Sequence, residues 1–292
     1  MRALLVKLLL HTTALLPLPI AHLLGVLIGY GLILTPNRTK RIAKINLALC
    51  FPELPAAHKS RLLRKTLIET GKTFTESGIL WLGSKNRLKR LIKNVEGEDI
   101  IQRAQEEGKG AIFIIPHIGN WEIIGLYCSQ RYPMTSLYRP PRMATLDHLV
   151  RTARQRYGAK LVPTNAQGVK ALLQAIKANG TTGILPDQDP KDSGGHFAPF
   201  FGIQANTMVL LSRLAQKTQA PTVLAYAERL SWGRGFHIHF APGPDAINSD
   251  DLDASLTSIN ALVELAINHI PEQYQWGYKR FKTRPAGDKA FY

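Results

Sequence analysis

The segment from Leu8 to Leu34 constrains this chain most, because its 27 residues include no aspartate, glutamate, lysine or arginine. As one helix rising about 1.5 Å per residue, it would be roughly 40 Å long, more than the ~30 Å hydrocarbon layer of a bilayer. Pro17 and Pro19 interrupt the segment, and a proline inside a helix removes a backbone hydrogen bond and bends the chain. The segment is therefore compatible with a re-entrant or oblique helix as well as with a straight transmembrane span.

A cleaved signal peptide or the buried helix of a soluble protein would have a similar apolar segment. No small-x-small cleavage site precedes Gly25, and the apolar run is long for a signal peptide. We therefore predict that residues 1–35 form an N-terminal membrane-anchoring helix and that residues 36–292 form a single domain. Basic residues flank the segment on both sides, with the denser cluster after it, which favours a cytoplasmic domain.

The chain is strongly basic, with 37 lysine and arginine residues against 21 acidic residues and a formal charge of +16. This excess predicts an anionic partner, such as nucleic acid, acidic lipid or a phosphorylated substrate. A hydrophobic content of 45% is enough to bury a core and excludes wholesale disorder. The two cysteines, Cys50 and Cys128, cannot form a disulfide scaffold or a zinc knuckle.

Short apolar runs alternate with helical stretches beyond the apolar segment. The expected strands are Ala111–Ile115, Met134–Tyr138, Lys160–Val162, Thr182–Leu185, Pro221–Ala227 and Phe236–Phe240. The expected helices are His58–Leu82, Lys85–Lys93, Trp121–Arg131, Leu146–Tyr157, Ala166–Ala178, Thr207–Gln219 and Leu252–Ile270. This alternation predicts an α/β fold with a mixed central sheet flanked by helices.

Several common catalytic signatures are absent from the sequence. It contains no G-x-S-x-G, G-x-G-x-x-G, C-x-x-C or H-E-x-x-H. Gly71-Lys72-Thr73 resembles the end of a phosphate-binding loop, but Thr66 stands where the first glycine of that loop is required. Serine hydrolysis and nucleotide hydrolysis therefore have no support.

The best catalytic candidate is the run 114–122, in which an apolar strand ends in a turn that carries His117. Glu122 follows five residues later, and on one continuous helix this spacing, about 500°, would point the two side chains apart. Gly119 and Asn120 supply a break, because both tolerate unusual backbone angles and asparagine caps helices. We expect Glu122 to orient His117, which would take up a proton at neutral pH. The spacing alone is equally compatible with a structural loop histidine.

Further motifs follow the His117 turn in a distinctive order. They are Tyr138-Arg139-Pro140, the stretch 185–190 (LPDQDP), the stretch 194–202 (GGHFAPFFG) and the stretch 276–282 (WGYKRFK). Together with H-x-x-x-x-E they resemble the bacterial lipid A biosynthesis acyltransferase family, the late acyltransferases of the lauroyl- and myristoyltransferase type. The resemblance covers essentially the whole chain. A wider group of glycerolipid acyltransferases shares an H-x-x-x-x-D/E pair, and glutamate is usual in the lipid A branch.

The resemblance implies an enzyme of the bacterial inner membrane, with its catalytic domain on the cytoplasmic side. It would transfer a fatty acyl chain from acyl carrier protein to the hydroxyl of a 3-hydroxyacyl chain on an anionic lipid A precursor. His117 would be the general base and Glu122 its orienting acid, and no cofactor or metal is needed. Backbone N–H groups after Gly119, or an arginine, would bind the oxyanion.

Four further residues are expected to bind substrate. Arg154 and Arg151 share a helix with His148 at spacings of three, and arginine suits a phosphate or sugar acid; a solvated basic face is the alternative. Asp187 follows a strand at its carboxyl end, where α/β sheets bind ligands, and is predicted to be a substrate-site or supporting acid. Arg139 ends another strand near the same edge and is a weaker candidate.

Three rival functions remain open. An acyltransferase acting on another membrane lipid, such as a lysophospholipid or a phosphoinositide glycoside, would use the same pair. A nucleic-acid binder would explain the charge, but no recognised module interleaves aromatic and basic residues, so no nucleic-acid partner is expected. A metal-dependent glycosyltransferase would rely on Asp187 and Asp189, and two carboxylates alone make a poor metal cage. Phe197, Phe200 and Phe201 would either line an acyl groove or pack a loop.

Overall fold

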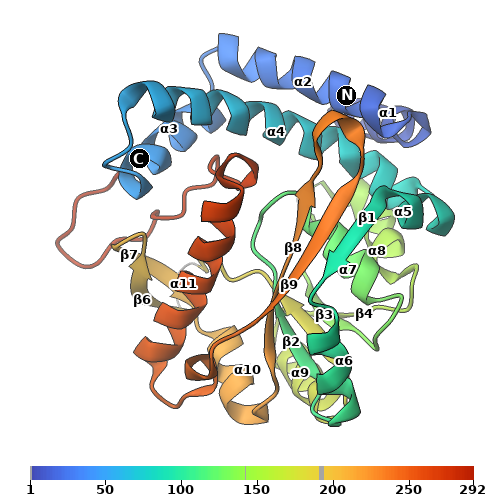
Figure 1. Ribbon diagram of the computed structural model, residues 1–292, viewed down its shortest axis with the longest axis vertical. Coiled ribbons are helices and arrows are strands. Elements are labelled where there is room, and N and C mark those ends of the chain that lie inside the picture. The colour runs from blue at the N-terminus through green and yellow to red at the C-terminus, as the bar shows by residue number, and fades with distance from the viewer. Residues whose placement is uncertain (1, 142, 191–193) are drawn as a thin grey trace.

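A five-stranded sheet forms the centre of the molecule in this computed structural model, which describes residues 2–141, 143–190 and 194–292. The strand order is β1 (Ile92–Glu96), β9 (Phe236–Pro242), β8 (Thr222–Arg229), β2 (Ala111–Ile114) and β5 (Thr181–Ile184) (Figure 1). Strands β8, β2 and β5 are parallel, and so are β1 and β9, whereas β8 and β9 are antiparallel. The sheet is therefore mixed, as predicted.

Two short strand pairs adjoin the central sheet. Strand β3 (Thr135–Tyr138) pairs in parallel with β4 (Lys160–Pro163), and a bridge at Met134 joins this pair to β5. Strands β6 (Gly195–Phe200) and β7 (Ile203–Met208) form an antiparallel hairpin. The hairpin contains the aromatic motif singled out in the sequence, so Phe197 and Phe200 belong to β6 and Phe201 belongs to the turn between the two strands.

Helices cover both faces of the sheet, because successive side chains along a strand point to opposite faces. On one face, Phe113 and Ile238 pack in a core beneath α6 and α7. On the other face, Ile112 and Leu224 pack in a core beneath α9, α10 and α11. The bounds of the helices after residue 84 are α5 (Lys85–Leu91), α6 (Asp99–Glu106), α7 (Trp121–Cys128), α8 (Asp147–Gln155), α9 (Ala166–Lys177), α10 (Leu210–Thr218) and α11 (Leu252–His269), with 3-10 turns η1 (Ala144–Leu146), η2 (Ser231–Gly233), η3 (Asp245–Asn248) and η4 (Pro271–Gln273).

Four helices precede the sheet: α1 (Arg2–Leu15), α2 (Leu18–Leu34), α3 (Arg38–Cys50) and α4 (Ala56–Leu82). Helices α1 and α2 both lie along α4 (Figure 1). The apolar segment is thus two helices, and the chain breaks just before α2 because Pro17 cannot continue the hydrogen-bond ladder of α1. Among the described residues no single helix is both long and apolar enough to cross a bilayer, while α2 and α3, bent by 80°, meet that requirement as a pair in length and composition.

Glycines allow α2 to approach α4 closely. A Cβ atom on Gly71 of α4 would lie 2.1 Å from the carbonyl oxygen of Gly25, and one on Gly25 would lie 2.6 Å from Cα of Lys72. Backbones can pack at this distance only where neither helix carries a side chain, as in small-residue crossings of membrane helices. The inner side of the apolar segment is therefore part of the packed fold.

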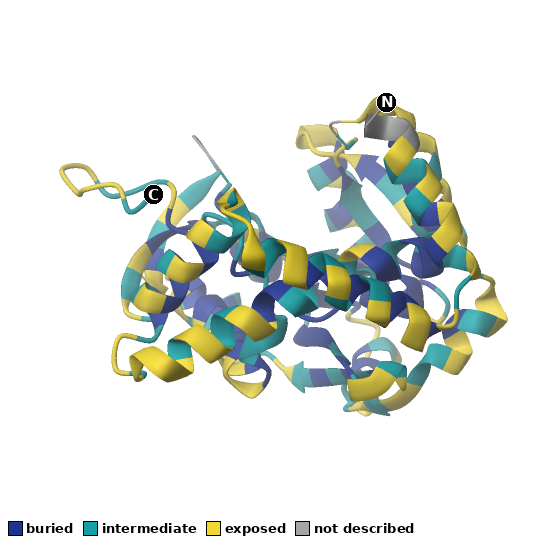
Figure 2. Cartoon of the chain, turned by 90° about the horizontal axis from the view of Figure 1, so that it is seen from above, coloured by how far each residue is buried: buried dark blue, intermediate teal, exposed yellow. Residues whose placement is uncertain are grey.

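The outer side of α1 and α2 is exposed, as the yellow stretches near the N-terminus in Figure 2 show, and most of its large side chains are apolar. Its large exposed side chains are Leu5, Leu8, Leu15, Ile20, Leu23, Leu27, Tyr30 and Leu34. Contiguous exposed apolar surface of this kind marks an interaction site in a folded protein.

The main departures from the predicted elements lie where helix and strand patterns adjoin. The basic helix expected to reach Lys93 ends at Leu91, and the chain continues directly as β1. Pairing with β9 overrides the local helical pattern there, because it satisfies the backbone groups of β1. Thr207, expected at the start of a helix, belongs to β7, and α10 begins at Leu210.

The crossing of α2 and α4 predicts unequal effects of two alanine substitutions in urea unfolding of the full chain. Gly71→Ala should destabilise the protein by about 1–3 kcal/mol, because the new methyl group meets backbone that cannot move aside. Gly31→Ala is the matched control, since a Cβ there meets nothing within 4 Å. It should be neutral or stabilising by up to about 1 kcal/mol, the helix-propensity gain. Equal stability of the two variants would contradict the close crossing.

Candidate active site

The turn after β2 places His117 at the edge of the sheet. Gly119 has φ +57°, in the left-handed region, and a Cβ there would lie 1.8 Å from the carbonyl oxygen of Ala227. Asn120 is the N-cap of α7, its side chain accepting a 3.3 Å hydrogen bond from the N–H of Glu122. The predicted break at Gly119 and Asn120 between strand and helix is thus confirmed, and only glycine fits the first of these positions.

Asp187 holds His117 by two hydrogen bonds. The His117 backbone N–H donates to Oδ2 of Asp187 at 2.9 Å, and Nδ1 of the ring donates to Oδ1 at 2.7 Å. The carboxylate lies just beyond β5, the strand next to β2, at the carboxyl ends of both strands. The ring also contacts Trp121 edge-on, with 4.8 Å between ring centroids. These contacts fix both the rotamer and the tautomer of the imidazole.

The other ring nitrogen of His117 faces a glutamine pair. Gln188 Nε2 donates to Oε1 of Gln275 at 2.9 Å and lies 3.1 Å from Nε2 of His117. An amide nitrogen can only donate, so His117 Nε2 carries the lone pair. The imidazole therefore presents a basic nitrogen opposite the one that Asp187 holds.

Asp187 is ionised and electrostatically coupled to His117. The carboxyl is almost completely buried. Burial alone would raise its pKa, but the electrostatic interaction with His117 and the two hydrogen bonds from that residue outweigh burial, so the pKa of Asp187 lies below its ordinary range. An ionised buried carboxylate favours the imidazolium that forms when His117 takes up a proton.

Glu122 does not make the contact that its spacing from His117 suggested. It forms a two-pronged ion pair with Arg154, in which Nε donates to Oε2 at 3.1 Å and Nη2 donates to Oε1. Burial would raise the pKa of Glu122, but the Arg154 charge and hydrogen bonds bring it below the ordinary value. The carboxylate on the imidazole is that of Asp187, because Glu122 sits in the first turn of α7 and faces α8 instead.

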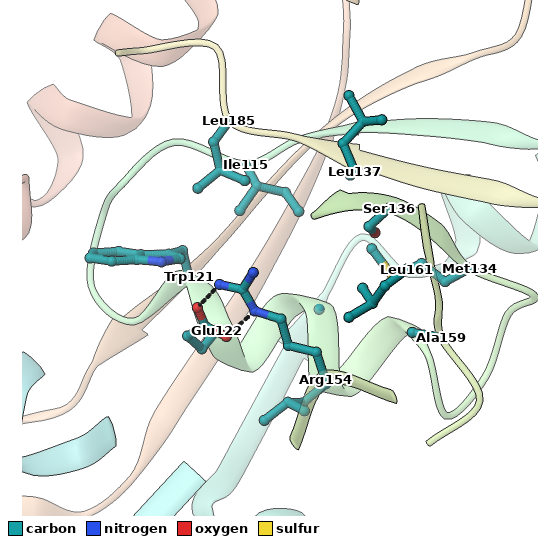
Figure 3. A pocket seen from close by; sticks show the side chains of 13 residues that line it. Ile115, Trp121, Glu122, Met134, Ser136, Leu137, Arg154, Ala159, Leu161 and Leu185 are labelled. Carbon is teal, nitrogen blue, oxygen red and sulfur yellow. Dashed lines mark hydrogen bonds and ion pairs between the residues drawn. The ribbon is translucent and has the colours of Figure 1, made fainter. Parts of the chain in front are cut away.

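Two cavities meet at Trp121 and Glu122. The inner one, of about 100 Å³, also includes Arg154 and aliphatic side chains around β2, β3 and β5 (Figure 3). The outer one, of about 400 Å³, lies between α1, α4 and the η4 region. Its apolar lining consists of Val6, Leu9, Leu10, Phe74, Trp81, Met143 and Leu146. The His117 ring contacts Trp121, which lines the outer cavity, and Gln188 beside the ring bonds to Gln275, which lines it as well. The imidazole therefore lies one side chain away from the outer cavity.

A partly buried histidine held by a buried carboxylate, near a large apolar cavity, is an arrangement suited to activating a hydroxyl of a lipid. Comparison with known proteins identifies the class. The family model of bacterial lipid A biosynthesis acyltransferases matches residues 2–283. The chain belongs to this family.

Several similar proteins are named as acyltransferases of lipid A biosynthesis. The chain is similar to the lipid A biosynthesis palmitoleoyltransferase of Escherichia coli (strain K12), with 28% identity over 281 residues, 95% of this chain and 90% of the relative. It is similar to the lauroyltransferase of the same organism, with 28% identity over 273 residues, 93% and 88% of the two chains. Its identity to the myristoyltransferase is 25% over 253 residues, 86% and 77%. The family resemblance drawn from the sequence motifs is confirmed.

The remaining predicted residues of this lipid A acyltransferase family member lie at different distances from the cavities. Arg151 is exposed, and its guanidinium lies 5.7 Å from the ring centroid of Tyr138, the same distance as that of Arg154. Arg139 is exposed beyond β3, and His148 is exposed on α8. Only Arg154 of the predicted basic group reaches the cavities, because it alone faces α7.

Asp189 and the phenylalanines of the later family motifs do not line the two cavities. Asp189 accepts hydrogen bonds from the Thr283 N–H at 2.9 Å and the Asn206 amide at 3.3 Å, so its carboxylate is turned to partners other than those of Asp187. Because the carboxylates of Asp187 and Asp189 bind different partners, they are not arranged to coordinate one metal ion together. Phe200 is buried in the core, and Phe201 packs against both Phe200 and Trp276. They therefore pack the core and do not line either cavity.

Sequence reasoning missed a buried ion-pair network behind the His117 turn. Arg229, at the end of β8, donates to both oxygens of Glu76, to Glu69 Oε2 at 2.7 Å and to the Gly119 carbonyl oxygen at 3.3 Å. Glu76 also accepts from the side chain of Asn120 at 2.8 Å, and His22 Nε2 of α2 lies 2.6 Å from it. The available signal was the seven-residue spacing of the two glutamates, which places them on one face of α4.

Arg229 keeps Glu76 ionised in the interior. Burial would raise the pKa of Glu76, but the charge and hydrogen bonds of Arg229 lower it from 4.5 to about 2. The ionised pair therefore contributes stability that is complete above pH about 4.5 and is lost as the pH falls through about 2. Above that range, removal of Arg229 alone would leave an unpaired buried charge.

We predict that Arg229→Met destabilises the protein by about 3–5 kcal/mol near neutral pH, the usual cost of breaking a buried ion pair. The cost relative to wild type should shrink as the pH falls from 4.5 towards 2, because Glu76 becomes neutral in both proteins. Urea unfolding of the full chain at several pH values measures this.

Two further variants control the measurement. Arg103→Met removes an exposed pair with Asp99 and should cost about 1 kcal/mol or less. Adding Glu76→Gln to Arg229→Met should recover part of the loss, because it removes the unpaired charge. A double variant that is no more stable than Arg229→Met would show that packing, and not charge, sets the cost.

Proposed function

We propose that this chain transfers a fatty acyl group from acyl carrier protein to the hydroxyl of a 3-hydroxyacyl chain on a lipid A precursor. The observation that carries the proposal is the Asp187–His117 pair, which presents Nε2 of the imidazole beside an apolar cavity of about 400 Å³. A cavity of this size and lining suits a lipid chain. The names of the family and its relatives support lipid A as the acceptor, and acyl carrier protein is the donor that the motif resemblance implies. The charge of +16 suits the anionic groups of both.

His117 acts as the general base. Its Nε2 takes the proton from the acceptor hydroxyl while the hydroxyl oxygen attacks the thioester carbonyl carbon. The tetrahedral intermediate then collapses, the carbon–sulfur bond breaks, and the imidazolium returns the proton to the leaving thiolate. Asp187 stabilises the imidazolium while His117 carries the extra proton. The acceptor hydroxyl takes the place that the Gln188 amide occupies at Nε2.

Arg154 binds substrate oxygen, with Glu122 as its positioning residue. The backbone N–H groups of Gly119 and Asn120 already donate to Gln273 and Ala227, so they are not available as oxyanion donors. Arg154 is the alternative donor, because two of its guanidinium nitrogens bond to Glu122 while the third points towards the inner cavity in Figure 3. Glu122 thus contributes through the arginine and through its negative charge near His117.

The outer side of α1 and α2 inserts into the bacterial inner membrane from the cytoplasmic side. Its exposed leucines adjoin the outer cavity, whose lining includes Val6, Leu9 and Leu10 of α1. Basic residues Arg38 and Lys40 follow α2 directly, where anionic headgroups would lie. A lipid acceptor would therefore reach the cavity without leaving the membrane.

The proposed chemistry is tested by transfer of a labelled acyl chain from acyl carrier protein to a purified lipid A precursor. His117→Ala should lower the turnover number by about 10²–10⁴-fold, the usual contribution of a general base. Asp187→Asn should cause a comparable loss, because the amide no longer stabilises the imidazolium. Arg154→Lys should mainly lower the turnover number, because an oxyanion donor acts in the transition state and lysine lacks the planar fork.

Arg139→Lys serves as the control for these variants, since that side chain is exposed beyond β3. Wild-type turnover by folded His117→Ala would contradict the mechanism. A lysophospholipid and a phosphoinositide glycoside are offered as acceptors in parallel assays. If only one of these lipids becomes labelled, the proposed chemistry stands but lipid A is not the acceptor.

Membrane docking predicts that Leu23→Glu combined with Leu27→Glu releases the protein from inner-membrane vesicles, because charges on the inserted face oppose burial in lipid. Leu265→Glu is the matched control, since Leu265 is equally exposed (62%) but lies on α11. Vesicle flotation measures the bound fraction. If Leu265→Glu is released from the vesicles, or if the double variant stays bound to them, the membrane contact lies elsewhere on the protein.

A further inference from the structure

Histidines and glutamates outside the acyl-transfer site gather on the face of the sheet that α11 covers. His237 and His239 alternate with buried apolar residues along β9, so both rings point to this face. The strand register places Glu96 of β1 opposite His239 and Glu228 of β8 opposite His237. His269, the last residue of α11, lies against His239, with 5.3 Å between ring centroids.

Glu96 lies at an unusual distance from the two β9 rings. Its Oε2 is 3.6 Å from Nε2 of His237 and 3.5 Å from Nδ1 of His239. Both distances are too long for good hydrogen bonds. They are close to the separation of roughly 3.3 Å between two ligand atoms in a tetrahedral zinc site with bonds of about 2.0–2.1 Å. The three ligand atoms all lie within 4.8 Å of one another.

The hydrogen bonds of His239 leave its Nδ1 without a proton. Its Nε2 donates to Oε2 of Glu228 at 3.1 Å, so in the neutral ring the Nδ1 lone pair faces the Glu96 carboxylate. Two electron-pair donors directed at the same space repel unless a cation lies between them.

We propose that Glu96, His237 and His239 bind a divalent transition-metal ion of the zinc type. Imidazole nitrogens with one carboxylate suit zinc and its neighbours, and water would take the open position. Glu228 holds the distal nitrogen of His239, as carboxylates commonly do for metal-bound histidines. The ion displaces the Asn94 side chain, whose nitrogen lies 3.0 Å from Nε2 of His237.

A metal ion here would fasten an edge strand. Strand β1 pairs with β9 alone in the central sheet, and its register is irregular between Ile92 and Asn94. Glu96 comes from β1 and the two histidines come from β9, so a bound ion links the two strands through their side chains. Because the ion binds only the folded chain, it raises the stability of the protein in proportion to its occupancy.

Titration of Zn²⁺ into the full chain, purified in detergent and freed of metal by a chelator, tests the site by calorimetry. Wild type should bind one ion per chain at this site, and its unfolding temperature should rise. Glu96→Gln and His237→Ala should each weaken binding by at least about tenfold through loss of a ligand, and Glu228→Gln by about 10–100-fold through loss of ligand orientation. Glu96 is 68% exposed, so its substitution leaves the core intact.

His196→Ala provides the matched control. His196 pairs with Asp253 at 2.7 Å on an exposed surface, so it is a histidine–carboxylate pair that belongs to neither potential metal group among the described residues. Its variant should bind Zn²⁺ as wild type does. Stoichiometric binding that persists unchanged in folded Glu96→Gln and His237→Ala, or no stoichiometric binding by wild type, overturns the proposal.

Discussion

The buried pairing of Arg229 with Glu76 is the interaction on which the arrangement of the candidate active site depends. Through it, β8, α4, α2 and the turn after β2 are joined at one point. The Gly119 carbonyl and the Asn120 side chain are both held there, and these two residues set where β2 ends and α7 begins. A buried ion pair is not an efficient source of stability, since apolar residues of similar volume are often as good. Its value in this fold is geometric, because hydrogen bonds fix the turn that carries His117 in one position.

The identity of the acid that holds His117 illustrates how parallel strands assemble a site. Glu122 is close to His117 in sequence, but it belongs to the first turn of α7 and pairs with Arg154 of α8. Asp187 is seventy residues away, yet it follows β5 directly, and β5 is the parallel neighbour of β2. The carboxyl ends of adjacent parallel strands meet at the same edge, so residues just beyond them come within hydrogen-bond distance. The resulting contact uses both oxygens of Asp187, one for the backbone N–H of His117 and one for Nδ1 of its ring.

Much of the architecture was predictable because the patterns of the central strands and helices are strong and local. The mixed sheet, the long helix α4, the break at Pro17 and the glycine–asparagine turn all follow from such patterns. Strand β1 and the hairpin β6–β7 were not, since their pairing depends on partners distant in sequence. In the site, His117 and Asp187 were named from motif and strand position, but their contact was not. The network of Arg229 escaped entirely, because no local pattern indicates which arginine will lie beneath a helix of the N-terminal region.

The packing of the N-terminal helices connects the apolar surface of the protein with its chemistry. Helix α1 contributes Val6, Leu9 and Leu10 to the outer cavity, while its neighbour α2 crosses α4 through glycines and reaches Glu76 through His22. One side of α1 is thus a wall of the cavity, and the outer side of both helices carries exposed apolar residues. If the proposed docking holds, a lipid chain would pass from bilayer to cavity along α1 without crossing water, avoiding the cost of hydrating its apolar surface. The packing of α1 against α4 would hold this wall in place beforehand, so that binding need not also order it.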